Sequence, residues 1–165
     1  MRPLPFIILA VVTLVLQVAL MPAIALTSAR FQPQLLLIVA MFVALYARAE
    51  IALIGCWVLG LMLDLATIGP MGAFAFAFGL AGLGIVSARA SIFRDHPLSH
   101  FFLALVFGLA ANEVVALRQA VVSGPSIQLV VLEPLGFAVY TALIAPYLML
   151  LLNRLRGVMD FPERA

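Results

Sequence analysis

The chain has no lysine and few charged residues of any kind. Of its 165 residues, 10% are charged and 66% are hydrophobic, and all nine cations are arginine. A soluble domain carries roughly 25% charged residues, so the charges here are too few to cover a water-facing surface. The net charge of +2 is also too small to indicate nucleic acid as a partner. We therefore expect most of the surface to face lipid.

Cysteine and recognisable catalytic motifs are also scarce. Cys56 is the only cysteine, so no intrachain disulfide is possible, and its place in an apolar run predicts a small packing residue. His96 and His100 are four residues apart without a third ligand nearby, which favours a solvated helix start over a metal site. The sequence contains no serine–histidine–aspartate arrangement and no glycine-rich phosphate loop. We expect a non-enzymatic protein without cofactor or metal.

Long apolar runs dominate the sequence instead. A bilayer core about 30 Å thick needs roughly 20 apolar residues per helix, and six runs of about that length are separated by proline, glycine or charge. They predict one all-α membrane domain over residues 1–165, a compact bundle of six transmembrane helices. The predicted spans are residues 4–21, 33–46, 51–68, 72–88, 97–116 and 130–152, the start of the sixth being the least defined.

The arginines predict the orientation of this bundle, because they concentrate at the cytoplasmic ends of membrane segments. With a cytoplasmic N-terminus, seven arginines lie inside and only Arg30 and Arg118 lie outside. Both termini are therefore predicted to be cytoplasmic. Arg2, the first apolar run and Ala23-Ile24-Ala25 also imitate a signal peptide, but cleavage there would place the new N-terminus outside.

Two carboxylates fall inside the predicted spans, where a charge costs at least about 2.5 kcal/mol and needs a reason. Asp64 follows Glu50 by a stretch of about 21 Å of helix, and Glu113 follows His100 by about 20 Å, so both lie at similar depth in the outer third. Asp64 could cap the outer end of its helix or bind backbone in the turn from Ala66 to Gly72, bind a partner, or handle a proton or ligand.

Arginines near the outer ends of the spans offer a counter-charge for Asp64. Arg118 is about 140° around its helix from Glu113 and cannot easily pair with it. We therefore hypothesise that Arg118 or Arg30 closes over Asp64. Asn112 and Gln17 are most simply interhelical hydrogen-bond donors, and Glu133 is predicted at the outer interface.

A motif of about forty residues resembles the rod shape-determining protein MreD family. Pro33-Gln34-Leu35-Leu36-Leu37 begins the second span, and a glycine-rich third span with Gly55 ends in Gly60-Leu61-Met62-Leu63-Asp64. Gly69-Pro70-Met71-Gly72 forms the short turn that follows. The similarity continues more weakly through Ile92-Phe93-Arg94 and the acidic residue Glu113.

This resemblance implies a non-enzymatic scaffold of the bacterial elongation machinery in the cytoplasmic (inner) membrane. Its implied partners are the single-span protein MreC and, through it, the peptidoglycan transpeptidase and glycosyltransferase pair and cytoskeletal MreB. The resemblance also implies the small six-helix fold of the S components of energy-coupling-factor transporters. The residues expected to serve as polar anchors are Asp64, Asn112, Glu113 and Arg118, and those expected to pack helices closely are Gly55, Gly60, Gly72 and Gly79.

Two other functions remain open from the sequence. A vitamin-binding transporter subunit would need a polar, aromatic-lined cavity open to the outside, yet the only tryptophan, Trp57, lies in mid-span and the outer loops are short. An intramembrane enzyme that used Asp64 and Glu113 as acid and base would need both carboxylates to face one water-filled pocket.

Overall fold

The fold is helical throughout the part of the chain that the computed structural model describes, which comprises residues 3–19, 32–67, 71–89, 96–124 and 128–159. This part contains six α-helices, one π-helical turn (Gln128–Leu132) and no strand. The helices are α1 (Pro3–Ala19), α2 (Leu35–Tyr46), α3 (Ala49–Ala66), α4 (Ala73–Ala88), α5 (Pro97–Ser123) and α6 (Glu133–Met159). The predicted all-α class and the order of six helices are confirmed.

The last two helices are longer than the sequence predicted. α5 begins at Pro97, as expected, because proline suits the first helical turn and the His96 side chain accepts a hydrogen bond from the Leu98 amide at 3.3 Å. It continues to Ser123 instead of stopping near residue 116, and it ends at Gly124, whose φ is +87°. α6 likewise runs to Met159 instead of 152.

Helix length divides the bundle into two groups. α3, α5 and α6 contain stretches that are long and apolar enough to cross a membrane, while the apolar parts of α1, α2 and α4 are shorter than 18 residues. The presence of three such helices indicates a membrane protein. Six complete crossings stay a prediction.

α2 forms the centre of the molecule. Eleven of its twelve residues are buried, and α1, α3, α4, α5 and α6 all contact it. A helix that is apolar all round is stable only where other helices or lipid surround it completely. The Leu-rich run that was predicted as the second span is therefore the core of the bundle.

The apolar side chains that face outward lie on the other helices. α1 exposes Leu4, Ile7 and Val15, and large apolar side chains are equally exposed on α6, for example Leu143 and Leu150. In water such a surface would be far larger than the apolar patches that monomeric proteins tolerate. The bundle is therefore apolar on its surface as well as in its core, and hydrocarbon is its expected surroundings.

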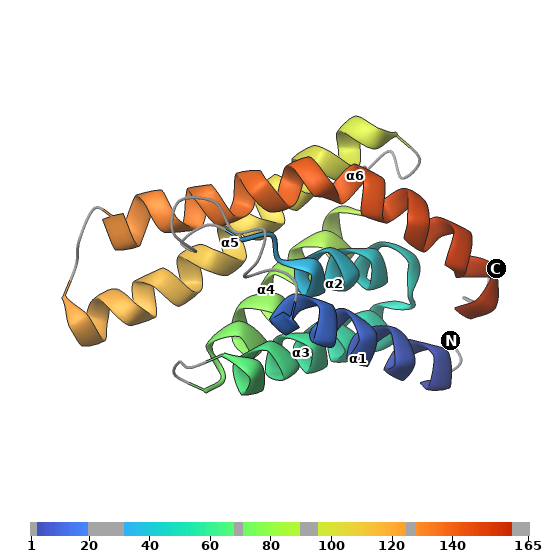
Figure 1. Cartoon of the computed structure of the whole chain (residues 1–165), viewed down its shortest axis with the longest axis horizontal. Helices are drawn as coiled ribbons and strands as arrows, with labels where there is room; N and C mark the ends of the chain where they lie inside the picture. The colour runs from blue at the N-terminus through green and yellow to red at the C-terminus, as the bar shows by residue number, and fades with distance from the viewer. Residues whose placement is uncertain (1–2, 20–31, 68–70, 90–95, 125–127, 160–165) are drawn as a thin grey trace.

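The helices alternate in direction, so α1 begins and α6 ends near the same end of the bundle (Figure 1). Arg48, Arg89 and Arg154 lie at that end, where Arg89 Nη1 donates to the Ala47 carbonyl at 2.8 Å. Arg118 lies near the end of α5, toward the opposite end. This distribution agrees with the predicted cytoplasmic termini, although the sidedness itself stays a prediction.

The hairpin of α5 and α6 is the longest part of the molecule. Figure 1 shows the end of α5 projecting beyond the end of α3 and the start of α4. Apolar residues near the tip are strongly exposed, Val121 by 87% and Val122 by 78%.

Candidate functional site

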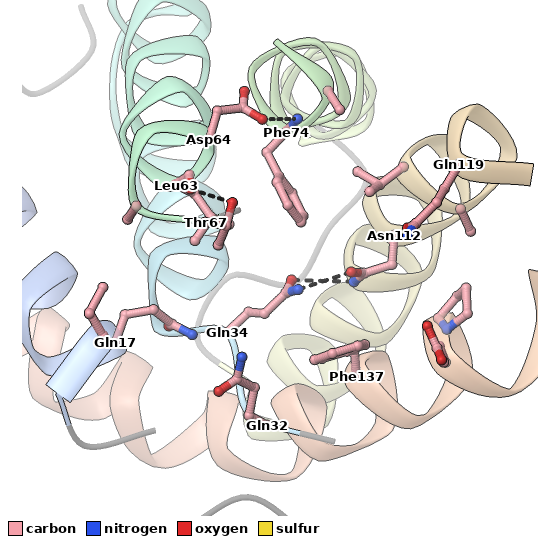
Figure 2. Close-up of a pocket in the computed structure, with 17 residues that line it drawn as sticks. Gln17, Gln32, Gln34, Leu63, Asp64, Thr67, Phe74, Asn112, Gln119 and Phe137 are labelled. Atoms are coloured by element: carbon pink, nitrogen blue, oxygen red, sulfur yellow. Dashed lines mark hydrogen bonds between the residues drawn. The ribbon is translucent and has the colours of Figure 1, made fainter. Parts of the chain in front are cut away.

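A cavity of about 410 Å³ opens among the helices, at the end of the bundle where α2 and α4 begin (Figure 2). The described residues that line it include Phe74 and Phe137 but no basic residue. Its polar lining residues are Gln17, Gln32, Gln34, Asp64, Thr67, Asn112, Gln119 and Glu133. Polar side chains from all parts of the sequence thus gather at one place inside an otherwise apolar bundle.

Two side-chain amides in the lining of the cavity bind each other. Gln34 Nε2 donates to Asn112 Oδ1 at 2.9 Å, and Asn112 Nδ2 donates to Gln34 Oε1 at 3.2 Å and to the Gly108 carbonyl at 2.8 Å. Asn112 is thus an interhelical hydrogen-bond donor, as predicted. Figure 2 shows the two amides meeting between α2 and α5.

The start of α2 is held by side chains from two other helices. The Gln17 side chain on α1 accepts from the Leu35 backbone amide at 2.6 Å and donates to the Pro33 carbonyl at 3.1 Å. The Thr141 hydroxyl on α6 accepts from the Gln34 backbone amide at 3.0 Å. The first amides of a helix have no partner within the helix, so buried helix ends need such acceptors. The prediction for Gln17 as an interhelical donor is confirmed.

The start of α4 is held in the same way by Asp64 at the end of α3. One carboxylate oxygen accepts from the Phe74 amide at 3.0 Å, and the other accepts from the Ala75 amide at 2.8 Å. A carboxylate at a helix N-terminus is favoured both by hydrogen bonding and by the helix dipole. Of the three possibilities left open by the sequence, backbone binding is the one observed, two residues beyond the expected turn.

The hypothesis that Arg118 closes over Asp64 is wrong for the described residues. Arg118 Nη1 donates instead to the Met71 carbonyl at 3.2 Å, in the turn that leads into α4, and no ion pair links it to the buried Asp64 carboxylate. Two backbone amides instead stabilise the carboxylate, one at each oxygen. Arg30, the other candidate, lies outside the described residues.

The two predicted carboxylates do not face one pocket. Asn112, Val115, Ala116 and Gln119 line the cavity from one face of α5, and Glu113 lies to the side of that face, half-buried. Glu133, at the first position of α6, is the second carboxylate in the cavity. The acid and base pair of Asp64 and Glu113 that an intramembrane enzyme would need is therefore not formed.

The glycines expected to receive a partner helix are mostly used inside the bundle. A Cβ atom on Gly60 would lie 2.7 Å from the Ala75 Cα and overlap the Phe74 carbonyl, and one on Gly55 would lie 3.0 Å from the Val43 side chain. Gly79 is half-buried, with only Trp57 in ordinary contact range at 3.7 Å. Gly60 and Gly55 thus pack α3 against α4 and α2.

Gly72 has a different role from the predicted close packing of helices. No atom lies within 4 Å of the Cβ that it would carry, but its φ of +88° is one that other residues rarely adopt. This left-handed residue directly precedes α4 and aims the Phe74 and Ala75 amides at Asp64. Gly72 is a turn residue.

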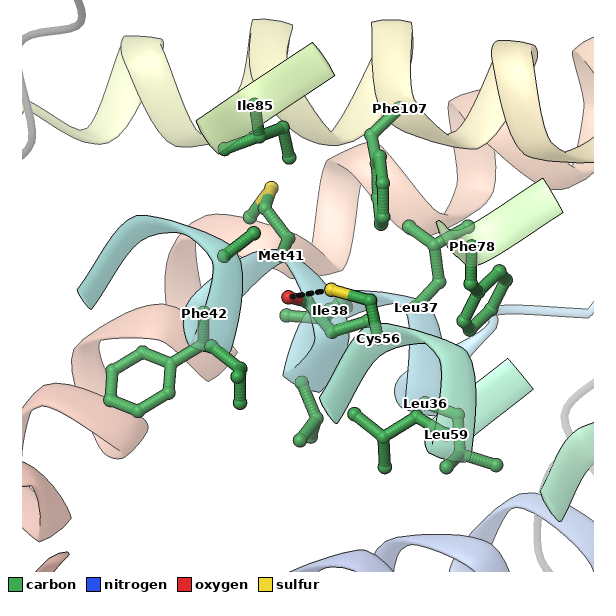
Figure 3. Close-up of a cluster of buried hydrophobic side chains, with 14 of the residues drawn as sticks. Leu36, Leu37, Ile38, Met41, Phe42, Cys56, Leu59, Phe78, Ile85 and Phe107 are labelled. Atoms are coloured by element: carbon green, nitrogen blue, oxygen red, sulfur yellow. Dashed lines mark hydrogen bonds between the residues drawn. The ribbon is translucent and has the colours of Figure 1, made fainter. Parts of the chain in front are cut away.

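Cys56 occupies the contact between α2, α3 and α4 (Figure 3). Its thiol is buried and donates to the Ala40 carbonyl at 3.4 Å, and a Cβ on Gly82 would lie 2.8 Å from its sulfur. The prediction of a small packing residue is confirmed.

The histidines take structural positions at the start of α5. His96 is exposed and caps the helix, which agrees with the predicted solvated helix start. His100 is buried one turn later, so that interpretation is wrong for His100. Within the described part of the chain, no group of three or more His, Cys, Asp or Glu residues is placed to hold a metal ion.

Sequence reasoning missed Gln34, Thr141 and Gln119. Gln34 had been counted only as part of the motif at the start of an apolar run, although a polar residue directly before a buried helix is well placed to satisfy its first amides. Thr141 is a polar residue within the sixth run, which was itself a signal for an interhelical hydrogen bond.

The comparisons with known proteins give one match. The family model described as rod shape-determining protein MreD matches residues 2–156 of the 165-residue chain. No curated protein and no solved structure matches it.

Proposed function

The chain belongs to the rod shape-determining protein MreD family, and we propose that it acts as a non-enzymatic scaffold of the bacterial cell-elongation machinery. The observation that carries the proposal is the family match over residues 2–156. Membership implies a role in rod shape determination, and the family is one of shape-determining components instead of known enzymes. In the proposal the protein crosses the cytoplasmic membrane six times with both termini inside.

The proposed partner is MreC, bound through its single membrane span, which links the scaffold to the peptidoglycan transpeptidase and glycosyltransferase pair and to MreB. The described residues place almost no mass outside the helices, so a partner must bind to helix faces or short turns. Helix association in lipid depends on close packing, which small residues permit.

The outward face of α4 supports the proposal as the place where such a span would bind. Phe76, Leu80 and Leu83 are each more than half exposed, and Gly84 lies beside them with no atom within 4 Å of the Cβ it would carry. Gly60, by contrast, is already covered by α4. A larger side chain at Gly84 therefore tests this face, whereas one at Gly60 would disturb the contact between α3 and α4.

The experiment is depletion of the protein in its rod-shaped host, followed by expression of variants and recovery of MreC with each purified variant in detergent. Depleted cells should become round, and the wild-type chain should restore rods. Gly84→Leu should lower MreC recovery at least fivefold. The matched control is Ala110→Leu, which adds the same side chain at an exposed position of α5 and should leave recovery unchanged.

Two results would contradict the proposal at different levels. Cells that stay rod-shaped after depletion would exclude the scaffold role itself. Rounding on depletion with equal MreC recovery by both variants would keep the scaffold role and exclude the α4 face as the binding site.

A further inference from the structure

Part of the cavity lining, here called its floor, consists of polar side chains that already form hydrogen bonds within the protein. These residues are Gln17, Gln34, Asp64, Thr67 and Asn112. Gln34 and Asn112 bond to each other, Gln17 and Asp64 hold the starts of α2 and α4, and the Thr67 hydroxyl donates to the Leu63 carbonyl at 2.8 Å. These bonds fix the shape of the floor. They leave its side chains little capacity to bind anything else.

Three other polar residues of the lining have no such partner. The side chains of Gln32, Gln119 and Glu133 make no hydrogen bond or ion pair with any residue in the described part of the chain, although all three line the cavity. Figure 2 shows Gln32 and Gln119 entering from different sides of the Gln34–Asn112 pair. Two amides and one carboxylate are thus available to a ligand.

The size of the cavity fits a ligand better than a packing defect. Protein interiors contain few voids larger than one water molecule, whereas small-molecule sites measure about 300–1,000 Å³. At about 410 Å³, this cavity falls within that range. Its lining also combines aromatic side chains with a few polar groups, as such sites do.

The charges of the lining decide the class of ligand. Asp64 and Glu133 contribute carboxylates, and none of the described lining residues is basic, so an anionic group would be repelled. The Glu133 carboxylate is a free, negatively charged acceptor, and a primary ammonium group is a cation that carries N–H donors. The amide oxygens of Gln32 and Gln119 are further free acceptors, on different sides of the Gln34–Asn112 pair. Phe74 and Phe137 add ring faces that attract cations.

We propose that this cavity is a binding site for a primary ammonium group, with the Glu133 carboxylate as its counter-charge and the amides of Gln32 and Gln119 as further polar groups of the lining. This chemistry occurs both in the headgroup of an aminophospholipid and in a free amine. Two of the lining residues are also exposed on the surface of the bundle, Val18 of α1 by 52% and Gln119 of α5. A lipid headgroup can therefore reach the site from the side of the bundle.

The test uses the full-length protein purified in detergent and titrated with phosphatidylethanolamine, phosphatidylcholine, phosphatidylglycerol and free ethanolamine. Binding is measured by native mass spectrometry and by the shift in unfolding temperature. Phosphatidylethanolamine should bind saturably, and phosphatidylcholine, which has no N–H donor, should bind at least tenfold more weakly. Competition by free ethanolamine would assign the site to soluble amines, and its failure to compete would assign the site to the lipid.

Variants separate the cavity from the general lipid-facing surface. Glu133→Gln should weaken phosphatidylethanolamine binding at least tenfold. Glu113→Gln, which removes a half-buried carboxylate outside the cavity, should change binding less than twofold. If Glu133→Gln does not yield a folded protein, the exposed Gln119→Leu serves instead, with an expected loss of at least threefold.

Three results would overturn the proposal. They are equal binding of phosphatidylcholine and phosphatidylethanolamine, no saturable binding of either phosphatidylethanolamine or ethanolamine, and equal effects of Glu133→Gln and Glu113→Gln. None of them bears on the scaffold role, because cell shape and MreC recovery are measured separately.

Discussion

The side-chain amides of Gln34 and Asn112 exchange two hydrogen bonds, of 2.9 Å and 3.2 Å, although 78 positions separate them in the sequence. Both residues are buried, and each amide is both donor and acceptor to the other. This pair joins the central helix α2 to the longer helix α5 beside the cavity. It therefore restricts the position of the start of α2 relative to α5.

The first prediction concerns the strength of this pair. Gln34→Ala and Asn112→Ala should each lower the free energy of unfolding, and the double variant should lose less than the sum of the two. The expected coupling is about 0.6–1.7 kcal/mol, the range found for interhelical hydrogen bonds in membranes. Reversible unfolding in detergent micelles measures it, and strictly additive losses would show that the two amides do not cooperate.

The second prediction concerns Asp64, which is only 5% exposed and accepts two backbone amides. Asp64→Asn replaces one acceptor oxygen with an NH₂ group, which faces an amide donor and leaves it unsatisfied. We expect a loss of about 1–3 kcal/mol in unfolding free energy, because buried unsatisfied donors cost about that much. Thermal unfolding in detergent measures the loss.

Glu113→Gln is the control for Asp64, because the Glu113 side chain makes no hydrogen bond within the described residues. It should change the unfolding temperature little. A normal unfolding temperature for Asp64→Asn would contradict the helix-capping role seen in the structure.

The third prediction compares two glycines of adjacent helices. Gly60→Ala should destabilise the bundle by about 1–3 kcal/mol, because the new methyl group would overlap the backbone of α4 and force α3 and α4 apart. Gly84→Ala should be neutral or stabilise by about 0.5–1 kcal/mol, because it meets no atom and alanine favours the helix. Unfolding temperatures of the two variants, measured side by side, test this. Equal temperatures would contradict the close contact of α3 and α4.

Several site residues could be recognised from sequence, but their partners could not. The cost of a charge in lipid was enough to single out Asp64, and that residue does have a defined role in the structure. The sequence suggested an arginine as its partner, because opposite charges attract. It could not reveal that Gly72 turns the chain so that two backbone amides reach the carboxylate first.

The position of Glu113 was also predicted only in part from the sequence. Distance along the helices predicted that Glu113 lies at a depth similar to that of Asp64, but it is the neighbouring residue Asn112 that lines one cavity with Asp64. Which of the adjacent residues Asn112 and Glu113 faces inward depends on the rotation of α5, and one position along a helix turns a side chain by about 100°. That rotation is set by contacts with α4 and α6, not by α5 alone.

The sequence by itself determined the all-helical class and the apolar surroundings, because hydropathy over some twenty residues depends only on local composition. It also carried the motif by which the family is recognised. Only the tertiary structure decided that the most apolar run, α2, is enclosed by protein instead of lipid, and that Gln17, Gln34, Asn112 and Thr141 meet around its start. The physical reason is that buried polar groups must find partners, and partners far apart in sequence are brought together only when the helices pack.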